Sequence, residues 1–160
     1  GDIVLHFRPL EYAASRCRLA PVGGYGAEGD FSDPSERRYA AAVLAIDCPL
    51  DIVVAHEVGH LMGLTHSLRE DGEGGTFDFA TGYGVENQFT TIMALPAAFG
   101  LATQAGVFSS PNLACGDSRC GIAEGEAGSS DVCSSVLLIL CGIRSGAIPT
   151  RFLGACLPVR

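Results

Sequence analysis

The chain has 160 residues, of which 48% are hydrophobic, and this length favours one domain with a real core over two domains of ordinary size. Its formal net charge of −8 comes from 18 acidic residues against ten arginines and no lysine, which argues against nucleic acid and anionic membranes as partners. No apolar stretch approaches the roughly 20 residues of a membrane-spanning helix, and no signal peptide is visible, so we expect a soluble mature protein or an excised fragment.

The first third of the chain predicts strands separated by loops. Ile3–Phe7 alternates weakly and suits a strand, while Leu10–Leu19 suits a short helix or a loop. Pro21–Pro34 is rich in Gly, Asp and Pro and predicts turns. Tyr39–Ile46 is an apolar run of strand length, so we expect a buried strand there.

A helix is predicted over Ile52–Leu64, because apolar residues recur there at helical spacing. Asp51 stands where an N-cap residue is expected. Gly63 is well placed to end the helix with a left-handed turn.

The part of the chain that follows predicts short and irregular elements. Glu70–Gly75 is an acidic, glycine-rich loop, and Thr76–Val85 suits an irregular extended segment. Gln88–Met93 leads into a turn, and the small-residue stretch Ala97–Gly106 is a candidate helix.

Seven cysteines without a CxxC pair predict disulfides rather than metal ligands, which points outside the cytoplasm. Because the number is odd, at least one thiol is free, bonded to another chain, or not part of the native protein. Cys115 and Cys120 enclose a loop short enough for a hairpin disulfide, if their Cα atoms come within about 7 Å.

The composition changes at Asp131, where three cysteines and the apolar run Val136–Leu140 arrive together. We therefore predict a main unit over residues 1–130 and an atypical tail of the same domain over 131–160. Two interpretations of this tail are open. It is either a frame-shifted, non-native translation or a lineage-specific buried pair of strands.

The segment HEVGHLMGLTH, which begins at His56, has the pattern of a catalytic metal site. His56 and His60 lie four residues apart on one helix face and can bind one ion. Gly63 permits a sharp turn, so that His66 can return as a third ligand while a fourth position stays open for water. Glu57 lies beside these ligands. The pattern predicts one catalytic Zn²⁺ on the three histidines, with Glu57 as general base.

The signature HExxHxxGxxH resembles the metzincin clan of zinc endopeptidases. Met93, 27 residues after His66 (93 − 66), lies where that clan has its Met-turn, and the segment Phe108–Asn112 resembles one found in secreted bacterial reprolysin-like peptidases. The resemblance covers residues 39–130 well and 1–38 loosely. It implies an α+β, zincin-like (metzincin) catalytic domain with a mixed sheet, an active-site helix and an irregular C-terminal subdomain, in a secreted or extracytoplasmic bacterial protein.

The resemblance also implies further site residues. Cys17 and Cys48 resemble a disulfide that in such proteins ties the strand region before the active-site helix. A peptide or protein substrate would lie extended against an edge strand within Cys17–Tyr25. An apolar pocket for the side chain after the cleaved bond would be walled by the residues that follow Met93, namely Ala94, Leu95 and Pro96.

The sequence departs from the pattern of the clan in two respects. Leu95 stands where several branches have a tyrosine, so no tyrosine role is carried over. Few residues precede His56 compared with the helix and strands that the clan places there, so we expect an N-terminally truncated sheet. Two other functions therefore stay open, a zinc-binding but inactive metzincin-like module and a non-peptidase zinc hydrolase. Calcium at Asp71–Glu73 is a further hypothesis against an ordinary solvated loop, because no EF-hand spacing is present.

Overall fold

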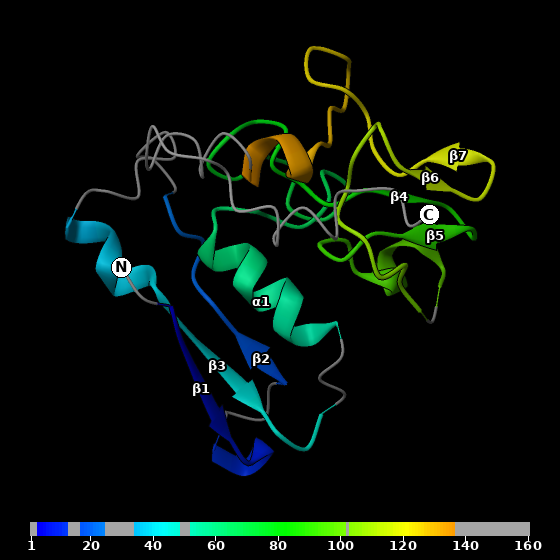
Figure 1. Cartoon of the computed structure of the whole chain (residues 1–160). Coiled ribbons are helices and arrows are strands. Elements are labelled where there is room, and N and C mark those ends of the chain that lie inside the picture. The colour runs from blue at the N-terminus through cyan, green and yellow to red at the C-terminus, as the bar shows by residue number, and fades with distance from the viewer. Residues whose placement is uncertain (1–2, 13–16, 25–33, 49–51, 102, 137–160) are drawn as a thin grey trace.

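The computed structural model describes residues 3–12, 17–24, 34–48, 52–101 and 103–136. A three-stranded sheet lies beside one helix, and short hairpins lie beyond the other side of that helix (Figure 1). The named elements are β1 (Val4–Arg8), η1 (Leu10–Tyr12), β2 (Arg18–Leu19), η2 (Pro34–Tyr39), β3 (Ala41–Ala45), α1 (Val53–Leu61), β4 (Gly84–Val85), β5 (Phe89–Thr90), η3 (Pro96–Phe99), β6 (Ala114–Cys115) and β7 (Ser118–Arg119).

The sheet is mixed and has the strand order β1-β3-β2. β1 runs parallel to β3, and β2 pairs antiparallel with β3, with Arg18 opposite Leu44. β3 is central and carries the buried side chains Ala42, Leu44 and Ala45, which confirms the predicted buried strand. The predicted strand at Ile3–Phe7 is also present, shifted by one residue to β1. Within this sheet, β2 is an edge strand.

Helix α1 is shorter than the sequence predicted. It ends at Leu61 because the chain turns at Gly63, whose φ of +82° is in the left-handed region that favours glycine. Ile52 occupies the N-cap position and makes no side-chain capping hydrogen bond. The predicted N-cap, Asp51, lies outside the described residues. The predicted glycine turn is thus confirmed, while the helix is trimmed at both ends.

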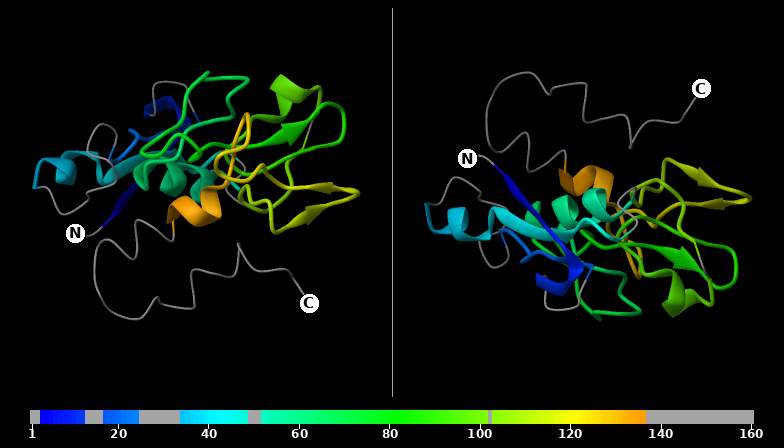
Figure 2. Two further views of the ribbon diagram at one scale, coloured as in Figure 1. Left: turned by 90° about the horizontal axis from the view of Figure 1, so that it is seen from above. Right: turned by 90° about the horizontal axis from the view of Figure 1, so that it is seen from below.

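The region after α1 consists mostly of loops with two-residue hairpins, β4–β5 and β6–β7. Seen from above and from below, these hairpins lie at the end of the molecule away from the three-stranded sheet (Figure 2). The helix predicted over Ala97–Gly106 is wrong beyond Phe99. Only the short turn η3 forms, because Gly100 adopts φ +69° and Ala105 then donates its backbone N–H to Thr90 of the neighbouring strand.

Both predicted disulfides are present. Cys17 and Cys48 have Cα atoms 5.7 Å apart, and those of Cys115 and Cys120 are 5.1 Å apart. The second bond closes the β6–β7 hairpin, as the spacing predicted. Cys133 also takes part in a disulfide.

The hydrophobic core lies beneath α1 and includes a residue of the predicted tail. Its buried cluster is Leu64, Ala80, Ile92, Met93 and Val132. Residues 132–136 are helical, so a strand pair is wrong for this stretch. Val132 donates its N–H to the Ser109 hydroxyl. The rest of the tail, 137–160, lies outside the described residues. None of the described helices is long and apolar enough to cross a membrane.

Candidate metal centre and active site

Helix α1 brings His56 and His60 together. They are one turn apart, both are buried, and their ring centroids are 4.7 Å apart. The Nδ1 atom of His56 lies 2.7 Å from the carbonyl of Ile92, and that of His60 lies 2.8 Å from the carbonyl of Leu64. A carbonyl only accepts hydrogen bonds, so each Nδ1 carries the proton and each Nε2 is left with a lone pair.

The turn at Gly63 returns the chain to these two histidines. A Cβ on Gly63 would lie 2.7 Å from the Gly23 carbonyl oxygen and from the Thr76 side chain, so no other residue fits without movement. Beyond the turn, the ring centroid of His66 lies 4.8 Å from that of His60 and 5.1 Å from that of His56.

Asp71 orients His66 from the following loop. Its carboxylate lies 3.1 Å from Nδ1 of the His66 ring and also accepts the His66 backbone N–H at 2.9 Å. A carboxylate behind a histidine fixes the tautomer and raises the basicity of the opposite nitrogen. The sequence marked Asp71 as part of an acidic loop and of a possible calcium site, and its contact with His66 was missed.

The three histidines fit a zinc ion. Their ligand atoms all lie within 4.8 Å of one another, and Nε2 of His56 is 3.2 Å from Nε2 of His66. Tetrahedral zinc with Zn–N bonds of about 2.0–2.1 Å requires nitrogens about 3.3 Å apart. All three Nδ1 atoms face acceptors, so the converging nitrogens are the unprotonated ones that zinc requires.

Burial favours the neutral form of the His56 and His60 imidazoles. Desolvation, followed by the positive charge of Arg18, lowers the pKa of His56 to about 3. Desolvation also lowers the pKa of His60. Neutral imidazole is the form that binds a metal, so at neutral pH both side chains are in that form.

Glu57 lies beside the cluster, with only 1% of its surface exposed. Its Oε1 is 3.3 Å from Nε of Arg18, and its Oε2 is buried without a hydrogen-bond partner. Burial raises the pKa of Glu57 to about 7, although the Arg18 charge opposes that rise. A buried carboxylate oxygen without a partner is costly, which is typical of a group that acts on a ligand or water. The sequence predicted Glu57 but gave no signal for Arg18.

Met93 lies directly beneath the active-site helix. It is fully buried, and a Cβ on Gly59 would lie 2.5 Å from its Sδ atom. Because Gly59 has no side chain, Met93 can pack against the helix between His56 and His60. The sequence predicted Met93 but did not single out Gly59.

Two side chains whose roles the sequence did not indicate brace the turn that contains Met93. The amide nitrogen of Gln104 donates to the carbonyls of Thr91 and Ile92 at 3.2 and 3.0 Å, and also to Ala94. The Ile92 carbonyl is the same one that orients His56. Glu70 joins this turn to the loop of the third histidine, because it accepts from the backbone N–H of Leu95 and from the hydroxyl of Ser67.

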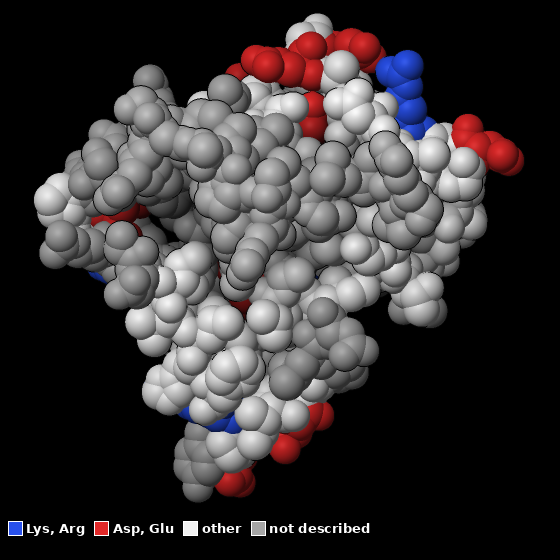
Figure 3. All heavy atoms as spheres, in the orientation of Figure 1, with Lys and Arg blue, Asp and Glu red and all other residues white. Residues whose placement is uncertain are grey.

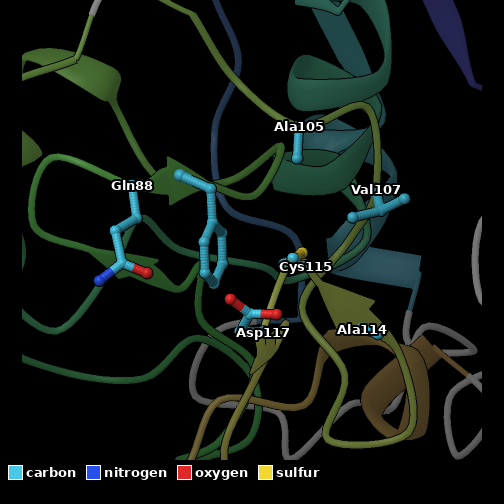
Figure 4. A pocket seen from close by; sticks show the side chains of 8 residues that line it. Gln88, Ala105, Val107, Ala114, Cys115 and Asp117 are labelled. Atoms are coloured by element: carbon cyan, nitrogen blue, oxygen red, sulfur yellow. The ribbon is translucent and has the colours of Figure 1, made fainter.

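The residues predicted to wall a substrate pocket follow this turn. Ala94 is fully buried, and Leu95 and Pro96 are half-buried. A cavity of about 410 Å³ lies elsewhere, between β5 and the β6–β7 hairpin (Figure 4). Phe89, Val107 and Asp117 are among its lining residues, and no histidine of the cluster lines it.

Calcium at Asp71–Glu73 stays a prediction. Among the described residues, the three histidines are the one group of three or more His, Cys, Asp or Glu side chains that converges on a point. Asp71 directs its carboxylate at His66, so in this structure it serves the histidine cluster.

Comparison with known proteins identifies the family. Residues 1–125 match the model of the Metallo-peptidase family M12B Reprolysin-like. The chain is also 36% identical over 118 residues to a protein of Pseudomonas aeruginosa (strain PAO1) named peptidyl-Asp metalloendopeptidase. This match covers 63% of the present chain. The match spans only 20% of that relative's own length, and no solved structure matches the chain. Because the family model covers most of the chain, including the whole histidine motif, the chain belongs to the reprolysin-like metallopeptidases of family M12B.

Proposed function

We propose that this chain is a zinc-dependent endopeptidase domain that hydrolyses peptide bonds in peptide or protein substrates. The observation that carries the proposal is the convergence of three unprotonated imidazole nitrogens next to a buried carboxylate, Glu57. The family match and the name of the Pseudomonas relative agree with it.

In this proposal the residues have distinct roles. His56, His60 and His66 hold the zinc, which when bound supplies Lewis-acid polarisation of the peptide carbonyl and acidifies water. Glu57 takes a proton from the attacking water and delivers it to the leaving amine, so that water and one peptide bond become a carboxylic acid and an amine. The unpartnered Oε2 atom of Glu57 is the position at which that proton would be held.

The substrate is proposed to lie extended beside β2, the edge strand of the described sheet, by main-chain pairing. Ala94, Leu95 and Pro96 remain the proposed wall of the pocket for the side chain after the cleaved bond. The name of the relative states an action on peptidyl-Asp bonds, and we extend that preference to this chain. The two disulfides described above support an extracytoplasmic location.

A casein digest with purified protein tests this function. We expect hydrolysis that stops with a chelator or a hydroxamate inhibitor, returns with added zinc, and accompanies about one zinc per chain. Stoichiometric zinc without hydrolysis would instead indicate an inactive zinc-binding module. Turnover of small esters or amides without protein cleavage would indicate a non-peptidase hydrolase.

A further inference from the structure

Arg18 places a positive charge beside Glu57 in the candidate active site. Its Nε lies 3.3 Å from Oε1 of Glu57, and its side chain is 25% exposed against 2% for Glu57. The guanidinium is therefore the solvent-accessible member of the pair, while the carboxylate lies deeper, beside the histidines.

The fold fixes Arg18 in this position. The preceding residue, Cys17, is disulfide-bonded to Cys48 and also accepts the backbone N–H of Ala45. Side chains alternate along a strand, and the other residue of β2, Leu19, is 58% exposed. Arg18 is thus directed toward α1 by a short edge strand that is anchored at its start.

Arg18 has N–H donors that its ion pair with Glu57 does not use. A guanidinium carries five N–H donors in a planar fork, and Glu57 faces Nε. In the part of the chain that the structure describes, no second acidic side chain lies within ion-pair distance of Arg18. Basic side chains are also sparse on the face shown in Figure 3, as the net charge of −8 leads one to expect. The carboxylate that best suits the remaining donors is one that arrives with the substrate.

We propose that Arg18 is a specificity-determining residue, which binds the carboxylate side chain of a substrate residue next to the cleaved bond. The inference rests on the proposed endopeptidase function. A peptide paired with the free edge of β2 would lie beside Arg18, and the guanidinium fork matches a carboxylate through two parallel hydrogen bonds. An uncharged amide of the same shape would lose the charge-assisted part of that interaction.

The test uses two N-acetylated, C-amidated peptides that differ only in one Asp or Asn, so that the side chain is the only carboxylate. The wild-type chain should cleave the Asp peptide with the higher kcat/KM. In Arg18→Gln the Asp/Asn ratio should fall by roughly tenfold or more. Arg18→Lys should keep part of the ratio, because the charge stays while the fork is lost. Arg119→Gln, on the distant hairpin strand β7, removes the same charge and should leave the ratio unchanged.

The outcomes separate specificity from the positioning of Glu57. If Arg18→Gln lowers kcat/KM for both peptides equally, Arg18 serves only the base, and the proposal is overturned. An equal rate for the two peptides in the wild-type chain overturns it as well. If the wild-type chain cleaves neither peptide nor casein, the endopeptidase function itself fails, and the inference fails with it.

Discussion

The sulfur atom of Met93 occupies the space that Gly59 leaves open, since a Cβ built on Gly59 would lie 2.5 Å from it. This contact joins the turn that contains Met93 to α1, at a position between His56 and His60. The fully buried Met93 has little room to move aside.

Gly59→Ala should therefore destabilise the fold, although alanine is the better helix former by about 1 kcal/mol. Overpacking a tight core costs about 1–3 kcal/mol, so we expect a net loss of about 1 kcal/mol in the free energy of unfolding. Urea denaturation measures it. Gly106→Ala is the matched control, because a Cβ there meets nothing within 4 Å. The penalty should disappear in a Met93→Ala background, and its persistence there would refute the contact as the cause.

Asp71→Asn should weaken zinc binding by about 10–100-fold, because the carboxylate that orients His66 is lost. Competition with a chromophoric chelator measures the affinity. Asp117→Asn makes the same chemical change on the β6–β7 hairpin and should bind zinc like the wild-type chain. Equal affinities in both variants would show that Asp71 does not support the metal site.

Gln104→Ala should lower the free energy of unfolding by about 1–3 kcal/mol, because the buried turn loses a donor shared by the carbonyls of Thr91, Ile92 and Ala94. Gln88→Ala is the control, since Gln88 is exposed. A Gln104 variant as stable as the Gln88 variant would contradict this bracing role.

The local spacing of residues predicted the convergence of the three histidines but not the side chains that support them. His56, His60, Glu57, Gly63 and His66 lie within one short segment, so helix geometry and the glycine turn are enough to relate them. Arg18, Gln104 and Asp71 reach the site from other segments, so their roles appear only once the chain is folded.

The helix predicted over Ala97–Gly106 is another case in which contacts with distant parts of the chain decide the structure. The small residues of Ala97–Gly106 suit a helix by propensity, but Ala105 bonds to Thr90 and Gly100 adopts a left-handed conformation. Tertiary hydrogen bonds thus outweigh a weak local preference.

The two disulfides should differ in their effect on stability and on the site. Cys17–Cys48 spans 31 residues and Cys115–Cys120 spans five, so loop-closure entropy predicts losses of about 3.7 and about 2.1 kcal/mol when each pair is replaced by Ala. Replacing the first pair should also lower the Asp/Asn selectivity, because Arg18 loses its anchor. Thermal unfolding and peptide kinetics measure the two effects. A larger stability loss for the hairpin disulfide would contradict this ordering.

The central claim is that Glu57 is the base of a zinc peptidase. The most direct measurement combines the zinc content and casein hydrolysis of Glu57→Gln, whose amide keeps the shape of the side chain but cannot accept the proton. We expect about one zinc per chain with hydrolysis reduced by at least about 100-fold. Hydrolysis at the wild-type rate by the zinc-loaded variant would contradict it.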